Sequence, residues 1–216
     1  MSIYLLDEKI WFPPVEEALP EGLLAVGGDL SIERLLLAYR SGIFPWFNED
    51  ELPMWWCPDP RFVLFPEELK ISKSMQQLIK KEAFDLRINT SFEQVIESCK
   101  GISRKDQDGT WITNEVEAAY IKLHQSGWAH CAEAWKDNKL VGGLYGIRMG
   151  NVFFGESMFS EVSNASKYAF IEYVKQLQQE GVQLIDCQVY TEHLESLGAR
   201  MISRKEFIKM LSESID

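Results

Sequence analysis

The segment at residues 129–160 reads AHCAEAWKDNKLVGGLYGIRMGNVFFGESMFS and carries the clearest structural signal in the chain. Three runs rich in apolar and aromatic residues are separated by the pairs Asp137-Asn138 and Gly150-Asn151, which are typical of tight turns between antiparallel strands. The pattern predicts a three-stranded meander with strands over 129–135, 140–149 and 152–159.

Helices and strands alternate on both sides of this meander. Upstream, the sequence predicts a helix over 69–81, a strand over 84–88, a helix over 91–99, a loop over 101–109 and a helix over 114–124 capped by Asn114. Downstream, it predicts a helix over 164–181, a strand over 182–189, a short helix to Leu197, a strand, and a helix from Lys205. This order indicates an α+β protein with a mixed β-sheet flanked by helices.

The first 60 residues differ, because proline and glycine interrupt them repeatedly. They predict an irregular, turn-rich segment with one helix over 33–40, for which Ser31 is the N-cap and Gly42 the stop. We therefore expect two domains, a small N-terminal lobe with tryptophan-bearing loops over residues 1–60 and a larger domain over residues 61–216.

The composition is typical of a folded protein, since 46% of the 216 residues are apolar and 12% are aromatic. The N-terminal residues lack the basic and then apolar pattern of a signal peptide, and no apolar stretch approaches the roughly 18 residues that span a bilayer. A cytoplasmic, reduced protein with no membrane contact is therefore expected. The cysteines lie too far apart in the sequence to suggest a zinc site or a disulfide framework; they are Cys57, Cys99, Cys131 and Cys187.

The net charge of −11 argues against a nucleic-acid partner only when the whole chain is averaged. Residues 69–105 hold eight basic and four acidic side chains, and the segment 69–81 contains no acid. If this segment is one helix, four lysines share an arc opposite an apolar face, namely Lys70, Lys73, Lys80 and Lys81. Such a face would confine a polyanion to one place, although an ordinary solvated lysine face has the same pattern.

Two carboxylates stand in apolar strands. Asp186 and Gln188 are two residues apart, so both side chains are expected on one face of the strand over 182–189. Glu156, in the last strand of the meander, would face them if the two strands meet near the centre of the sheet. Such a group either orients a substrate or forms a structural hydrogen bond, and clustered acids favour a cationic ligand.

Aromatic residues are dense at 44–47 and 55–58, where prolines accompany Trp46, Trp55 and Trp56. Tryptophans in proline-rich loops are hard to bury fully, and an exposed ring stacks on a nucleobase with about 1–3 kcal/mol. Trp111 is a third candidate, although such residues more often pack in a core.

The sequence contains no phosphate-binding Gly-x-x-x-x-Gly-Lys-Ser/Thr loop, no dinucleotide fingerprint and no Gly-x-Ser-x-Gly elbow. His124, His130 and His193 lack the spacing of metal ligands. Group transfer by orientation and hydrogen bonding, with no metal and no cofactor, is the chemistry that these observations favour.

Eight short motifs follow one another along the chain: residues 22–30 (GLLAVGGDL), 42–47 (GIFPWF), 55–56 (WW), 58–61 (PDPR), 109–113 (GTWIT), 155–159 (GESMF), 164–167 (NASK) and 184–189 (LIDCQV). In this order they resemble the bacterial leucyl/phenylalanyl-tRNA–protein transferases over roughly residues 10–210. The resemblance implies a GNAT-like fold for the larger domain. It also implies that Leu or Phe moves from Leu-tRNA or Phe-tRNA to the α-amino group of proteins with N-terminal Arg or Lys, which generates an N-end rule degradation signal.

Matching positions also imply roles for residues. Asp186 and Gln188 would serve the chemistry, and Glu156 would lie near the acceptor. The terminal adenosine of the tRNA would be held by Trp46 and Trp111. The tRNA body would contact Lys73, Lys80 and Lys81. The aminoacyl side chain would enter a pocket formed by Leu144, Phe153, Met158, Phe170 and Ile185.

In the expected mechanism Gln188, oriented by Asp186, hydrogen-bonds the attacking amine of the acceptor. Positioning dominates, because an amide is a poor proton acceptor. A monomer is expected. The chain departs from the family in ending soon after Leu211, without the longer tail of some members, and in a less charged basic helix, which predicts weaker tRNA affinity.

Two other functions stay open. An acyl-CoA-dependent N-acetyltransferase would share the GNAT scaffold, but residues 159–165 contain no glycine for a pyrophosphate loop. A non-enzymatic module could bind basic N-termini through the tryptophans and acids.

Overall fold

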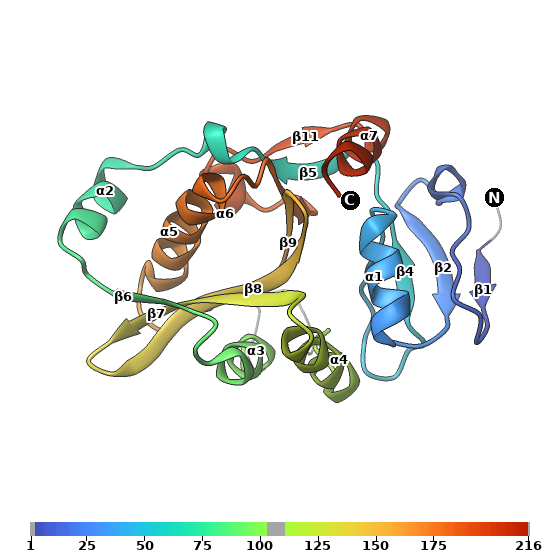
Figure 1. Cartoon of the computed structure of the whole chain (residues 1–216), viewed down its shortest axis with the longest axis horizontal. Helices are drawn as coiled ribbons and strands as arrows, with labels where there is room; N and C mark the ends of the chain where they lie inside the picture. Colours follow the sequence, from blue (N-terminus) through green and yellow to red (C-terminus); the bar gives the residue numbers. More distant parts are fainter. Residues whose placement is uncertain (1–2, 103–110, 216) are drawn as a thin grey trace.

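The computed structural model describes residues 3–102 and 111–215 and contains two β-sheets (Figure 1). The larger sheet has seven strands in the order β11-β5-β10-β9-β8-β7-β6. These strands are β5 (Arg61–Leu64), β6 (Asp85–Ile88), β7 (Ala129–Lys136), β8 (Lys139–Met149), β9 (Val152–Ser160), β10 (Leu184–Gln188) and β11 (Arg200–Ile202).

The meander predicted from residues 129–160 is present as β7, β8 and β9, which pair antiparallel. Strand β10 pairs with β9 in parallel and with β5 antiparallel, so the sheet is mixed. The helices of the larger domain are α2 (Lys73–Lys80), α3 (Phe92–Gly101), α4 (Asn114–Gln125), α5 (Ala165–Gln179), α6 (Glu192–Glu195) and α7 (Arg204–Ser214). The predicted α+β class, with a mixed sheet flanked by helices, is confirmed.

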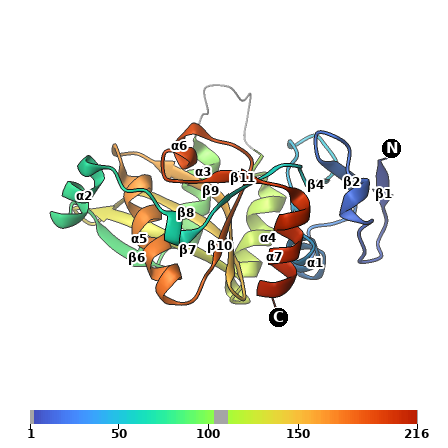
Figure 2. The ribbon, with the colours of Figure 1, turned by 90° about the horizontal axis from the view of Figure 1, so that it is seen from above.

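Two buried cores lie on opposite faces of the large sheet. On one face α5 packs over residues that include Leu144, Phe153 and Ile185. On the other face α3 and α4 pack over residues that include Tyr145 and Phe154, and this core continues into the N-terminal lobe. In both views α2 lies at one end of the molecule and the N-terminal sheet at the other (Figure 1, Figure 2).

The N-terminal residues are more regular than the sequence predicted. They form a four-stranded sheet in the order β1-β2-β4-β3, with β1 (Tyr4–Leu6), β2 (Leu23–Gly27), β3 (Phe44–Pro45) and β4 (Met54–Trp56), around α1 (Ile32–Arg40). These strands have two to five residues and are interrupted by proline and glycine, so alternation is too short to detect. The expectation of an irregular segment was wrong, and the boundary at residue 60 stays a prediction.

Several predicted helix ends are corrected. The Thr113 hydroxyl, and not Asn114, caps α4, because it accepts the Val116 N–H at 3.2 Å. The lysine helix begins at Lys73 after the short 3-10 helix η2 (Pro66–Glu68), so Lys70 lies outside it. The predicted cap of α1 is confirmed, since the Ser31 hydroxyl accepts the Arg34 N–H. A second 3-10 helix, η1 (Val15–Glu17), precedes β2.

The start of α5 packs closely on β8. A side chain at Gly142 would meet the Cβ of Ala165 at 2.6 Å and the Ser166 nitrogen at 2.8 Å. Glycine at this position therefore allows the helix to approach the sheet. Most of the predicted loop at 101–109 lies outside the described residues, and no described helix is long and apolar enough to cross a membrane.

Candidate active site

The candidate site lies where β9 and β10 separate. The two strands pair only between 184–186 and 152–154. Beyond this point β9 shifts register against β8 near Gly155, and β10 shifts register against β5 between Asp186 and Gln188. Such bulges re-aim side chains next to active sites. The space that opens is a cavity of about 380 Å³.

Gln188 has a strained backbone at this bulge. Its φ angle is +62°, and the following Val189 N–H donates to the Cys187 carbonyl at 2.7 Å, which closes a tight turn. A residue other than glycine in this region costs on the order of 1–3 kcal/mol, so the surrounding structure must hold it there. The Gln188 backbone N–H donates to Asp186 Oδ1 at 2.9 Å, and its side chain donates through Nε2 to Glu156 Oε1 at 3.0 Å.

Glu156 is surrounded by donors from three elements. Besides Gln188, the hydroxyl of Tyr39 on α1 donates to Oε1 at 2.8 Å, and the hydroxyl of Tyr120 on α4 donates to Oε2 at 3.1 Å. Burial raises the pKa of Glu156 to about 7, and the hydrogen bonds from the two tyrosines oppose this rise. Burial and the nearby carboxyl hold the pKa of both tyrosines well above 10, so both hydroxyls stay protonated. Glu156 therefore changes charge near neutral pH.

Asp186 is fully buried and forms a two-point ion pair with the buried Arg61. The Arg61 Nε donates to Oδ1 at 2.8 Å and Nη2 donates to Oδ2 at 2.7 Å. The guanidinium lies between the rings of Phe44 and Phe207, at 4.7 and 4.6 Å from their centroids. Asp186 thus holds the backbone of Gln188 and lies behind the cavity rather than on its wall.

The apolar wall of the cavity includes four of the five predicted pocket residues, namely Leu144, Met158, Phe170 and Ile185. The fifth, Phe153, is fully buried and packs its ring against Tyr173 at 5.3 Å, outside this wall. Glu156 and Gln188 also line the cavity, as do Thr191 and His193. One small volume therefore combines an apolar pocket with a carboxyl and an amide.

The two predicted adenosine-binding tryptophans have different surroundings. Trp46 follows β3 and is 38% exposed, with its ring centroid 5.9 Å from that of Trp56. Trp111 is 7% exposed and belongs to the same buried cluster as Val116 and Tyr120 of α4. Trp55, predicted on a loop, is fully buried in β4 and donates to the Gly27 carbonyl at 2.9 Å.

Lys73, Lys80 and Lys81 are exposed on or next to α2, far from the N-terminal sheet (Figure 1). Within residues 3–102 and 111–215 they form no ion pair. Met75 is buried on the opposite side of the helix. A cationic face therefore exists at Lys73, Lys80 and Lys81 but without the predicted Lys70, and none of these lysines lines the cavity.

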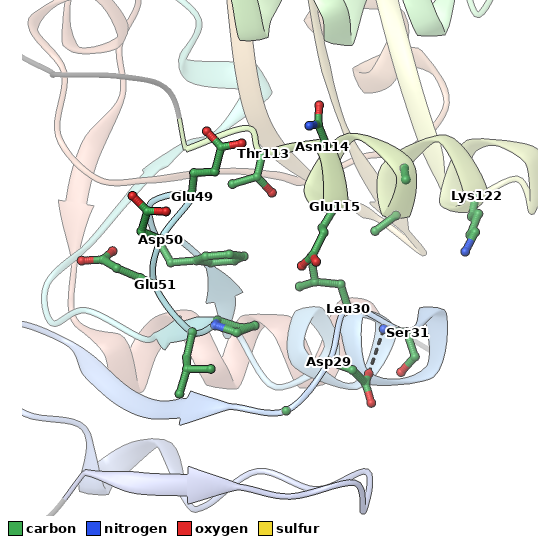
Figure 3. Close-up of a pocket in the computed structure, with 16 residues that line it drawn as sticks. Asp29, Leu30, Ser31, Glu49, Asp50, Glu51, Thr113, Asn114, Glu115 and Lys122 are labelled. Carbon is green, nitrogen blue, oxygen red and sulfur yellow. Dashed lines mark hydrogen bonds between the residues drawn. The ribbon is translucent and has the colours of Figure 1, made fainter.

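A second cavity, of about 970 Å³, lies between the N-terminal lobe and α4. Figure 3 shows the loop carrying Glu49, Asp50 and Glu51 on one side and Glu115 of α4 across the space from it. Lys122 is the basic residue on this wall. Among the described residues the acids do not gather into a group that could hold a metal ion.

Tyr39, Tyr120 and Arg61 complete the site but escaped the sequence reasoning. Both tyrosines lie on helix faces that read as ordinary core, and Arg61 begins a short strand that was not predicted. One signal was available for Arg61, because it is the single basic residue between 52 and 68 in a segment with three acids. A carboxylate in an apolar strand needs such a partner.

An apolar pocket that ends on a hydrogen-bonded carboxyl and amide is typical of a site that binds and orients a substrate. Residues 63–212 match the family model described as leucyl/phenylalanyl-tRNA protein transferase, and residues 28–59 match the model of its N-terminal domain. The chain belongs to this aminoacyltransferase family.

Curated relatives carry the same name over nearly the whole chain. The leucyl/phenylalanyl-tRNA–protein transferase of Flavobacterium johnsoniae is 57% identical over 97% of this chain and 99% of its own length. That of Christiangramia forsetii is 55% identical over 97% of this chain and 100% of its own length. Among solved structures, a GCN5-related N-acetyltransferase-like protein from Streptococcus suis has a TM-score of 0.39 at 13% identity, covering 83% of this chain and 67% of that chain.

Proposed function

We propose that this protein transfers Leu or Phe from aminoacyl-tRNA to the α-amino group of proteins with N-terminal Arg or Lys. The product would carry an N-end rule degradation signal. The observation that carries the proposal is the cavity between β9 and β10, where an apolar pocket ends on Glu156 and Gln188. Membership in the family supports the aminoacyl-tRNA as donor.

In the reaction the amine nitrogen attacks the ester carbonyl carbon, the bond to the ribose oxygen breaks, and the amine loses a proton while the ribose oxygen gains one. Because the Nε2 of Gln188 donates to Glu156, its Oε1 would be the atom that accepts a hydrogen bond from the attacking amine. An amide takes no proton at neutral pH, and Gln188 therefore orients the amine. Well-oriented groups can contribute about 7–11 kcal/mol, and an aminoacyl ester is already activated.

Glu156 holds the cationic acceptor end in this proposal. A carboxyl with a pKa of about 7 is partly ionised at neutral pH and attracts an ammonium group. Asp186 would act through Gln188 and not touch the substrate, because it is fully buried and does not line the cavity. Asp186 is thus a positioning residue.

The donor tRNA would be held at separate places. The exposed ring of Trp46 offers a face for the terminal adenine, whereas Trp111, at 7% exposed, offers little ring surface for it. The pocket for the Leu or Phe side chain comprises Leu144, Met158, Phe170 and Ile185, with Phe153 supporting them from behind. The tRNA body would lie along the molecule toward Lys73, Lys80 and Lys81.

We propose a monomer, because Tyr39 of the N-terminal lobe and Glu156 of the larger sheet already complete the site within one chain. The same contact supports a shared role of the small lobe and the GNAT-like domain in the site. A cytoplasmic location fits the buried thiols of Cys57, Cys131 and Cys187, which form no disulfide with another described residue.

An N-acetyltransferase using acyl-CoA is less well supported. It would need free backbone amides at the start of α5 for the pyrophosphate. The Ala165 N–H instead donates to the Val162 carbonyl at 3.0 Å, and the Ser166 N–H to Ser160 Oγ at 3.2 Å. Asn164 precedes them with φ at +67°, and Gly142 packs against this turn.

The deciding assay incubates labelled Leu-tRNA and a peptide that begins with Arg, with and without ribonuclease. We expect ribonuclease-sensitive transfer, whereas transfer from acyl-CoA alone would reject the proposal. Gln188→Ala should lower kcat about 100-fold at saturating acceptor, because orientation of the amine is lost. Gln178→Ala, on the exposed end of α5, is the matched control. A normal rate for Gln188→Ala would show that Gln188 has no such role.

A further inference from the structure

Gly155, in strand β9, is a glycine that the fold does not require. Among the glycines in residues 3–102 and 111–215, all but two have a left-handed backbone or would place a Cβ within 3.0 Å of another atom, and the two exceptions are Gly101 and Gly155. Gly101 is the exposed last residue of α3, and glycine is common at helix ends. At Gly155, an added Cβ would meet the Asp186 carbonyl oxygen at 3.6 Å, which is an ordinary contact distance, and no other atom outside its chain neighbours within 4 Å.

A glycine inside a strand therefore needs another explanation. Glycine in a strand stabilises the fold less than alanine does, because it loses more conformational freedom on folding. A bulge such as the one in β9 demands glycine only where the backbone is left-handed, and the backbone of Gly155 is not. The remaining explanation is a ligand that lies close to the backbone. Gly155 lines the cavity, so a ligand can reach it.

The space beside Gly155 lies where the cavity passes from one face of the sheet to the other. Leu144 and Ile185 of the cavity wall belong to the core under α5, whereas Tyr145 of the same wall belongs to the core on the opposite face. The cavity therefore reaches both faces at the point where β9 and β10 separate. The Cβ that Gly155 lacks would lie in this separation, next to the carbonyl oxygen of Asp186 on β10.

We propose that the reacting ester of the aminoacyl-tRNA lies against the backbone of Gly155. The proposal rests on the proposed transferase function and adds the place of the ester carbonyl. In that function the Leu or Phe side chain occupies the apolar wall at Ile185, and the attacking amine meets Gln188. Asp186 separates these two residues on β10, and its carbonyl oxygen is the atom nearest to the missing Cβ. Because the ester carbonyl joins the aminoacyl side chain to the attacking amine, it would occupy the space that a side chain at position 155 would fill.

The test is Gly155→Ala, assayed with labelled Leu-tRNA or Phe-tRNA and a peptide that begins with Arg. A methyl group in this space should displace the ester by about 1 Å and lower kcat about 100-fold for both donors, while the KM for each aminoacyl-tRNA stays within about threefold. The midpoint of urea unfolding should not fall, because alanine fits without a clash and restricts the unfolded chain. Gly101→Ala, outside the cavity, is the matched control and should keep wild-type kinetics.

Failure of this proposal and failure of the transferase function give different results. A wild type that transfers neither Leu nor Phe rejects the function, whereas normal transfer by both the wild type and Gly155→Ala overturns the place of the ester alone. Losses for Leu and Phe that differ by more than about threefold would assign Gly155 to the side-chain pocket, and a change confined to the KM of the peptide would assign it to the acceptor, so either result overturns the proposal. A lower unfolding midpoint also overturns it, because the fold would then require glycine. The pH at which activity is half-maximal should not move, since a shift would show that the alanine acts through Glu156 and not on the ester.

Discussion

Arg61 and Asp186 form a buried ion pair in which two guanidinium nitrogens donate to two carboxylate oxygens at 2.8 and 2.7 Å. The pair joins the first strand after the N-terminal lobe to the strand that carries Gln188. Because Asp186 also accepts the Gln188 N–H, the ion pair fixes the strained turn that points Gln188 into the cavity. A buried charge pair thus holds the amide that we propose orients the acceptor amine.

Removing one partner of this pair should destabilise the protein strongly. Asp186→Leu leaves Arg61 buried without a counter-ion, and Arg61→Met leaves Asp186 in the same condition, so each should cost about 3–5 kcal/mol of unfolding free energy. The double variant should cost less than the sum of the two, because no isolated charge remains. Urea unfolding of the four proteins measures the difference, and strictly additive losses would contradict the coupling.

Activity should depend on the charge of Glu156. Its pKa is raised to about 7 from an ordinary value of 4.5, so transfer should rise with pH through about 7 as the carboxylate forms. The acceptor amine titrates at about 7.7–8.0 and adds its own rise. Glu156→Gln keeps the shape but does not titrate, so its profile should retain only the rise that belongs to the amine. If the wild type and Glu156→Gln had identical pH profiles of kcat/KM, Glu156 would not be the titrating group.

The free energy of unfolding should also depend on the ionisation of Glu156, but it should fall with rising pH where the activity rises. A carboxyl whose pKa is higher in the folded state holds its proton more tightly there, so its contribution is full below pH 4.5 and is lost as pH rises toward about 7. Glu156→Gln should therefore gain unfolding free energy relative to the wild type between these pH values. Urea unfolding at pH 5 and pH 8 measures this gain, and a constant difference would contradict the raised pKa.

Tyr39→Phe should move the Glu156 titration although Tyr39 belongs to the N-terminal lobe. Burial raises the Glu156 pKa and the Tyr39 hydroxyl opposes this, so losing the hydroxyl should shift the acid limb of the activity profile to higher pH. Tyr4→Phe, in the same lobe but on strand β1, is the control. The two lobes would be independent in catalysis if Tyr39→Phe kept the wild-type profile at full activity.

The sequence predicted most of what depends on long, regular patterns. The meander at 129–160 and the helices after it were found because their apolar periods run over many residues. The N-terminal strands were missed, since their two to five residues are stabilised by pairing with one another and not by local pattern. The prediction that Asp186 and Gln188 alternate simply along a strand did not anticipate the bulge between them.

The chemistry was predictable in part. Glu156 and Gln188 stood out as polar groups in apolar strands, and the structure brings them within 3.0 Å of each other. Their partners could not be identified, because Tyr39 and Tyr120 come from helices 117 and 36 residues away in the chain. A tyrosine on an apolar helix face is predicted to pack in the core, and its role in the site becomes visible only when the carboxyl that its hydroxyl contacts is known.

The lysines of α2 should control a small part of tRNA binding. Their contact region is short in an acidic protein, so few phosphates are neutralised, and the plot of log Kd against log salt should be shallower than expected for about eight contacts. Replacing Lys73, Lys80 and Lys81 with Gln should weaken binding of Leu-tRNA and lower the salt slope by about 2–3, because each phosphate contact contributes about 0.7–0.9. Lys209→Gln, on the exposed part of α7, should change neither quantity. If the salt slope of the wild type were as steep as expected for about eight contacts, the RNA would bind a much larger surface. If the triple variant kept the wild-type slope, the tRNA would bind elsewhere on the protein.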